Sequence, residues 1–171
     1  MARHVMYPAA CCALIVLALG LTGCPYSFTG GSVPSHLKTV SIPLVDDQSG
    51  FGSAGLREKF TTELTNLFTG DNSLEVADRT IADCVLEGVI ISVSDAPSVV
   101  GQGEQVRKRR ITISVKYVFQ DLKLRKKVWE KTLSNWGDYD SGGGVSRREE
   151  GIQDAIKKLT EDVLLATVST W

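Results

Sequence analysis

The sequence predicts an α+β two-layer sandwich, in which two helices pack on one face of a mixed, mainly antiparallel sheet of about four strands. Residues 56–69 and 152–166 each carry apolar side chains at three- and four-residue steps, the pattern of a helix that covers a sheet. The segment from Val106 to Phe119 instead alternates apolar and polar residues. An alternating strand has one core face and one solvated face, so both helices are expected on the same side of the sheet.

The first strand is predicted over residues 39–45 (TVSIPLV). Pro43 has no N–H to donate to a neighbouring strand, so this strand is either an edge or ends there. Ser53 is the expected N-cap of the first helix, whose apolar stripe comprises Leu56, Phe60, Leu64, Leu67 and Phe68. Residues 70–72 (GDN) end that helix, and residues 74–77 could form a short strand.

Three β segments and a second helix complete the predicted domain. Residues 81–93 are apolar on both faces, which indicates a central strand, and a loop is expected over residues 95–105. Residues 106–119 and 128–136 predict an antiparallel hairpin in which position 110 lies opposite position 138. A glycine-rich loop is expected over residues 137–145, and it leads to Ser146, which forms a capping box with Glu149 at the start of the second helix. The stripe of that helix comprises Ile152, Ile156, Leu159, Val163 and Ala166.

The first 23 residues have the features of an export signal. Arg3 and His4 precede a run of 13 largely apolar residues, whereas a membrane-spanning helix needs about 20. The following Leu21-Thr22-Gly23-Cys24 resembles the lipobox of bacterial lipoproteins. The resemblance implies cleavage between Gly23 and Cys24, with a diacylglycerol and an acyl chain attached to Cys24. The alternatives are an uncleaved membrane helix or a buried core helix.

The chain is therefore divided into a signal peptide (1–23), a lipidated connector (24–38) and a single domain (39–171). Several acyl chains hold a protein on a membrane without a spanning segment. The residue after Cys24 is Pro25 rather than the Asp that retains lipoproteins in the inner membrane, which favours the outer membrane. A formal net charge of −1 gives the chain no general attraction to nucleic acid.

The sequence contains few candidates for chemistry, and we expect no enzyme, no metal site and no cofactor beyond the lipid on Cys24. His36 is expected to be a solvated loop residue, and no nucleophile elbow accompanies it. Cys84 is expected to act as a small buried hydrophobe. The acidic pairs 46–47 and 149–150 fit capping and solvation better than metal binding.

One charged feature is more distinctive: Arg107, Lys108, Arg109 and Arg110 follow one another at the start of the alternating strand. Such a run can be a solvated strand end that discourages edge pairing. It can also bind a phosphorylated glycolipid, because arginine grips phosphate with two parallel hydrogen bonds. A second run, residues 125–127, is expected at the opposite end of the hairpin.

The lipobox followed by residues 24–30 (CPYSFTG) and 33–43 (VPSHLKTVSIP) resembles the start of LptE-type lipopolysaccharide-assembly lipoproteins. The resemblance implies two helices on a four-stranded sheet and an outer-membrane lipoprotein that plugs and helps assemble the β-barrel LptD. It also implies contact with lipopolysaccharide, for which Arg107, Lys108, Arg109 and Arg110 are the candidates. The competing class is a lipoprotein adaptor or activator of another envelope complex, such as a cell-wall synthase activator or a secretion-associated lipoprotein.

Overall fold

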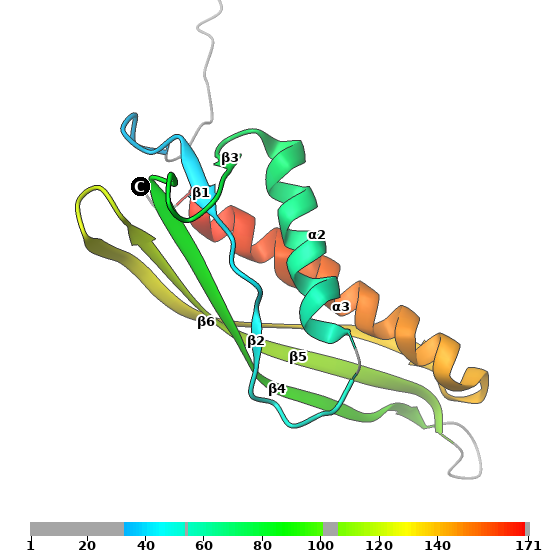
Figure 1. Ribbon diagram of the computed structural model, residues 1–171. Coiled ribbons are helices and arrows are strands. Elements are labelled where there is room, and N and C mark those ends of the chain that lie inside the picture. The colour runs from blue at the N-terminus through cyan, green and yellow to red at the C-terminus, as the bar shows by residue number, and fades with distance from the viewer. Residues whose placement is uncertain (1–32, 54, 101–105, 170–171) are drawn as a thin grey trace, which may run out of the picture. The chain divides into compact units, whose positions relative to one another are not determined.

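The computed structural model describes residues 33–53, 55–100 and 106–169, and Cys24, the predicted signal peptide and most of the connector lie outside these ranges. One mixed sheet is covered on one face by two helices (Figure 1), which confirms the predicted two-layer α+β fold. In chain order the elements are β1 (Thr39–Ser41), β2 (Asp46–Asp47), α2 (Leu56–Asp71), β3 (Glu75–Val76), β4 (Cys84–Val100), β5 (Val106–Asp121), β6 (Lys126–Asp140), η2 (Ser141–Gly143) and α3 (Gly144–Val168).

The strand order is β3-β1-β4-β5-β6, and β2 pairs with β4 outside this path. β1 pairs with β3 and β4 in parallel, and parallel neighbours need a crossover connection, which α2 supplies between β1 and β3. The β4–β5 and β5–β6 pairs are antiparallel. The sheet therefore has three long strands and three very short ones, where about four strands were predicted.

The predicted first strand is broken in two. β1 ends at Ser41, and pairing resumes only in β2, which lies against Val89 and Ile90 of β4. Pro43 lies between the two pieces and cannot donate a ladder hydrogen bond. Of the two alternatives for this segment, an edge strand or an early end, the second is therefore correct, since β1 has a neighbour on each side.

β4 is longer than predicted and contains a bulge. Ile90 stands opposite Val115 and Ser92 opposite Ser114, so Ile91 is the extra residue and its side chain is 42% exposed. The bulge exchanges the two faces of the strand, because side chains alternate with a period of two. Beyond it, Asp95 stands opposite the buried Ile111, in a segment for which a loop was expected.

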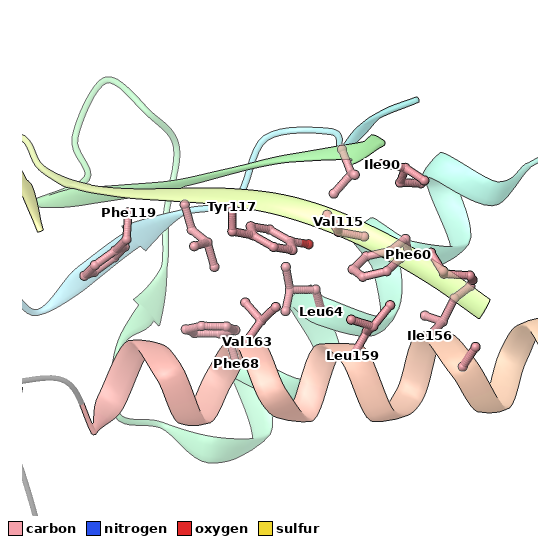
Figure 2. Packing of buried hydrophobic residues seen from close by; sticks show 14 of the residues in the cluster. Phe60, Leu64, Phe68, Ile90, Val115, Tyr117, Phe119, Ile156, Leu159 and Val163 are labelled. Carbon is pink, nitrogen blue, oxygen red and sulfur yellow. The ribbon is translucent and has the colours of Figure 1, made fainter. Parts of the chain in front are cut away.

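The hydrophobic core lies between the sheet and the two helices (Figure 2). The predicted stripes supply it, with Phe60, Leu64 and Phe68 from α2 and Ile156, Leu159 and Val163 from α3 buried against the sheet. The facing residues of the sheet include Ile90, Val115, Tyr117 and Phe119. Burying one large apolar side chain contributes about 1.5–3 kcal/mol, so this layer is the main source of stability.

Glycines, and not the predicted serines, precede both helices. Gly55 is the N-cap of α2 and Gly143 that of α3, and neither helix has a side-chain cap, so the predicted roles of Ser53 and Ser146 are wrong. β6 runs on to Asp140 because it stays paired with the first residues of β5, which leaves no room for the predicted loop over residues 137–145. The end of α2 follows the prediction, with Asn72 in the left-handed conformation at its C-cap.

Residues 33–38, predicted as part of the connector, pack on the domain. Leu37 is buried in the core and Val33 lies against it. His36 Nε2 lies 2.7 Å from Asp121 Oδ2, and the backbone N–H of Lys38 donates to Asp83 Oδ2. This segment is thereby held at the end of the sheet where β5 turns into β6.

Candidate functional site

Strand alternation divides the predicted basic run between the two faces of the sheet. Ile111, Ile113 and Val115 face the helices, so Arg109 shares their side. Lys108 and Arg110 point to the other side, which no helix covers. The four consecutive cations therefore do not form one patch.

Arg109 belongs to a network centred on Asp95, which the sequence did not reveal. Asp95 accepts hydrogen bonds from Arg109 Nε at 2.8 Å, from Arg148 Nε at 3.1 Å and from Tyr139 Oη at 2.8 Å. Arg148 also lies over the ring of Phe51, 4.6 Å from its centroid. Strands β4, β5 and β6 and helix α3 each contribute one residue, so the network joins the two layers at this end of the sheet.

The charges of this network stabilise one another. Burial opposes ionisation of Asp95, but the hydrogen bonds from Tyr139, Arg109 and Arg148 outweigh it and lower the pKa of the carboxyl below its usual value. The bond to Asp95 likewise raises the pKa of Arg109. Arg109 is thus already paired with a carboxylate of its own domain, Asp95.

Arg110 forms the corresponding pair on the uncovered face. Its Nε and Nη2 atoms donate to the two oxygens of Asp138 at 2.7 and 2.9 Å, a bidentate geometry. Its guanidinium also lies 4.9 Å from the ring centroid of Trp136. Since Arg110 and Asp138 are opposite each other in the ladder, the predicted hairpin register is confirmed.

Arg107 and Lys108 differ from their two neighbours. Both side chains are exposed, and neither forms an ion pair within the part of the chain that the structure describes. Of the four candidate lipopolysaccharide contacts, these two are therefore the groups available to an external phosphate. The second basic run, residues 125–127, lies at the other end of β5 and β6, as predicted. Its middle residue, Lys126, stands opposite Asp121, the last residue of β5, in the β5–β6 ladder.

The remaining sequence candidates serve the fold. His36 lies in a turn with its side chain 39% exposed, as expected of a solvated loop residue, and it also contacts the buried Asp121. Cys84 is buried as expected, and desolvation raises the pKa of its thiol to about 12, so it stays protonated and unreactive. Glu149 and Glu150 pair with Lys59 and Arg147, and neither caps the start of α3.

Solved structures of other proteins share this fold at low sequence identity. A family DUF330 protein from Xanthomonas campestris matches with a TM-score of 0.62 and 11% identity, over 82% of this chain and 90% of its own. A protein from Chlamydia trachomatis matches with a TM-score of 0.56 and 11% identity, over 75% and 94%. PelC from Paraburkholderia phytofirmans, a dodecamer, matches with a TM-score of 0.53 and 16% identity, over 83% and 94%. At such identities these likenesses concern the fold alone.

Comparison with curated proteins found no match. Among the helices that the structure describes, none is long and apolar enough to cross a membrane. The model of the LptE family, described as lipopolysaccharide-assembly, matches residues 37–167, a range that extends from the residues just before β1 into the last turn of α3. The family suggested by residues 21–43 is thereby confirmed over the folded domain, and the chain belongs to the LptE family of lipopolysaccharide-assembly proteins.

Proposed function

We propose that this protein is an outer-membrane lipoprotein, anchored through Cys24, that binds and plugs an LptD-type β-barrel and assists lipopolysaccharide assembly at the cell surface. The observation that carries the proposal is the family match over residues 37–167. The lipobox-like residues 21–24 support the anchor, and Pro25 in place of Asp supports the outer membrane.

The protein works by binding and not by catalysis. Among the residues that the structure describes, the two side chains most suited to nucleophilic or general-base chemistry both have partners within the fold. Cys84 is buried and its Sγ lies 3.2 Å from the carbonyl oxygen of Thr39, while His36 is held by Asp121. A candidate nucleophile needs a base within hydrogen-bond reach, and these two residues have structural partners instead.

Within this function, Arg107 and Lys108 contact the phosphates of lipopolysaccharide. Their exposure and lack of ion pairs among the described residues leave their donors to an incoming anion, and charge-assisted bonds to phosphate are among the stronger hydrogen bonds of proteins. Arg109 and Arg110 contribute by holding the start of β5 in place through Asp95 and Asp138.

Affinity purification from detergent-solubilised outer membrane tests the partner. A large β-barrel protein recovered with the lipidated chain is the expected result. Recovery of a penicillin-binding protein in its place would overturn the proposal in favour of a cell-wall synthase activator. The experiment is needed because one fold serves several functions, and the fold does not choose between these partners.

Single charge reversals test the lipopolysaccharide contact. Arg107→Glu and Lys108→Glu should each weaken binding of purified lipopolysaccharide by about tenfold, the equivalent of about 1.4 kcal/mol. The matched control is Lys157→Glu, which reverses an exposed lysine on α3. Equal affinities for all three variants and the parent protein would exclude Arg107 and Lys108 as contacts.

A further inference from the structure

The end of the domain at which the described residues begin carries an exposed apolar and basic surface. The turn after β5 presents Leu124, which is 65% exposed, followed by the exposed Arg125 and Lys126. Ile81, in the connection between β3 and β4, is 73% exposed. Figure 1 shows the turn (yellow), the β3–β4 connection (green) and the first described residues (blue) at the same end. We call Ile81, Leu124, Arg125 and Lys126 the anchor-end surface.

Hydrogen bonds cross-link the three segments behind this surface. Lys123 Nζ lies 2.7 Å from both the carbonyl oxygen of His36 and Asp83 Oδ1. The backbone N–H of Leu122 donates to the carbonyl of Asp83, and that of Leu124 donates to Asp121 Oδ1. These contacts hold the turn that carries Leu124 in a fixed position. The exposed Leu124 side chain itself adds no stability to the domain.

Charge pairing leaves a positive excess at the turn. Three carboxylates beside the turn have partners within the domain, since Asp83 pairs with Lys123, Asp121 with His36, and Glu130 with Lys116 and Lys127. Arg125 and Lys126 form no ion pair with any residue that the structure describes. A partner for this surface therefore combines negative charge with an apolar layer that can receive leucine and isoleucine side chains.

Covalent geometry limits how far this surface can be from a membrane. Val33, the first described residue, is nine positions after Cys24, and a chain of that length spans at most about 30 Å. Arg107 is fourteen positions before Asp121 along β5, which corresponds to about 45 Å of extended strand. The β5–β6 turn can therefore lie close to the membrane that would hold the lipid on Cys24, whereas the Arg107 end of the hairpin is about 45 Å away along the strand.

We propose that the anchor-end surface docks on the membrane that holds the lipidated Cys24, with Leu124 and Ile81 entering the headgroup region and Arg125 and Lys126 contacting anionic phospholipid. Basic residues are attracted to anionic lipid surfaces, and apolar side chains beside them add contact area. The docked domain stands with Arg107 and Lys108 pointing away from the bilayer. The inference rests on the proposed lipid anchor.

The test uses the lipidated chain with the substitution Leu124→Cys, labelled with an environment-sensitive thiol dye. Cys84 is fully buried and Cys24 carries lipid, so labelling is selective. The protein is placed in phosphatidylethanolamine vesicles with and without phosphatidylglycerol. Val145→Cys is the control, because Val145 is 83% exposed and lies at the start of α3, at the other end of that helix from the anchor-end surface.

We expect a blue shift of the dye at position 124 in vesicles that contain phosphatidylglycerol, and none at position 145. Adding Arg125→Glu with Lys126→Glu should abolish the shift, whereas Arg107→Glu with Lys108→Glu should leave it in place. Flotation of the protein with vesicles but unchanged emission at position 124 would overturn this inference alone. Mass spectrometry that found no acyl chains on Cys24 would overturn the proposed anchor together with it.

Discussion

Arg109 Nε donates a 2.8 Å hydrogen bond to Asp95 Oδ1 across the β4–β5 ladder. Asp95 stands opposite Ile111, so Arg109 is its diagonal neighbour on the face that the helices cover. The relationship depends on the bulge at Ile91, without which Asp95 would point to the other side of the sheet. Arg148 and Tyr139 complete the shell of donors around a carboxylate whose side chain is only 15% exposed.

Substituting Asp95→Asn should lower the free energy of unfolding by about 1.5–3 kcal/mol, because the change weakens charge-assisted hydrogen bonds at a largely buried position. Urea denaturation followed by circular dichroism measures the change. Asp138→Asn is the control, since the Arg110–Asp138 pair is more exposed and such pairs contribute about 0–1 kcal/mol. Equal losses in the two variants would show that Asp95 is no more important than a surface partner.

Tyr117→Phe should leave stability unchanged or raise it. The Tyr117 hydroxyl is fully buried and has no hydrogen-bond partner among the described residues, so its removal relieves a desolvation cost. Tyr139→Phe is the opposite case, because that hydroxyl donates to Asp95 and its loss should cost about 1 kcal/mol. Thermal unfolding of the two variants compares them directly. A large loss in Tyr117→Phe would indicate that this hydroxyl has a partner in solution.

Gly137→Ala should destabilise the domain strongly. A Cβ at Gly137 would lie 2.0 Å from the carbonyl oxygen of Gly151, so β6 and α3 would have to move apart. The expected loss is about 1–3 kcal/mol, as for other overpacked sites, and equilibrium denaturation measures it. Gly70→Ala is the control: a Cβ there meets nothing within 4 Å, and alanine in place of glycine should stabilise α2 by about 0.4–1 kcal/mol.

Acid should weaken the contact between residues 38–39 and the β3–β4 connection. The hydrogen bond from Lys123, followed by that from the N–H of Lys38, lowers the pKa of Asp83 to about 2, whereas an unfolded aspartate titrates near about 3.9. A depressed folded-state pKa contributes stability above the unfolded value, and the contribution is lost as the pH falls from about 4 through about 2. Urea denaturation should therefore show a steeper loss between pH 5 and pH 2.5 for the parent protein than for Asp83→Asn. Parallel losses would contradict a lowered pKa for Asp83.

Much of the fold could be predicted because the signals are local. The stripes of α2 and α3 follow the helical period, and β5 alternates because one of its faces is buried. The hairpin register followed from a short turn between two such strands, which placed residue 110 opposite residue 138. Pro43 limited the first strand to two outcomes, an edge strand or an early end, because its missing N–H is a property of the residue itself.

The candidate site was less predictable, because it depends on contacts between distant parts of the chain. The run of four cations was evident, but its separation into two paired and two exposed side chains was not. The acceptor of Arg109 lies in a segment predicted as a loop, and Arg148 arrives from the start of α3. Only a prediction of the bulge at Ile91 would have placed Asp95 opposite the buried Ile111 and so indicated a buried carboxylate that needs donors.

The sequence by itself determined the class of fold, the two helical stripes and the family, since each depends on residue types at fixed spacing along the chain. Tertiary structure alone decided which of the four cations are paired, where the bulge falls and that Gly55 and Gly143 are the N-caps of the helices. Those outcomes depend on the strand or helix that lies alongside, and the energy of a pairing between distant segments is not contained in either segment.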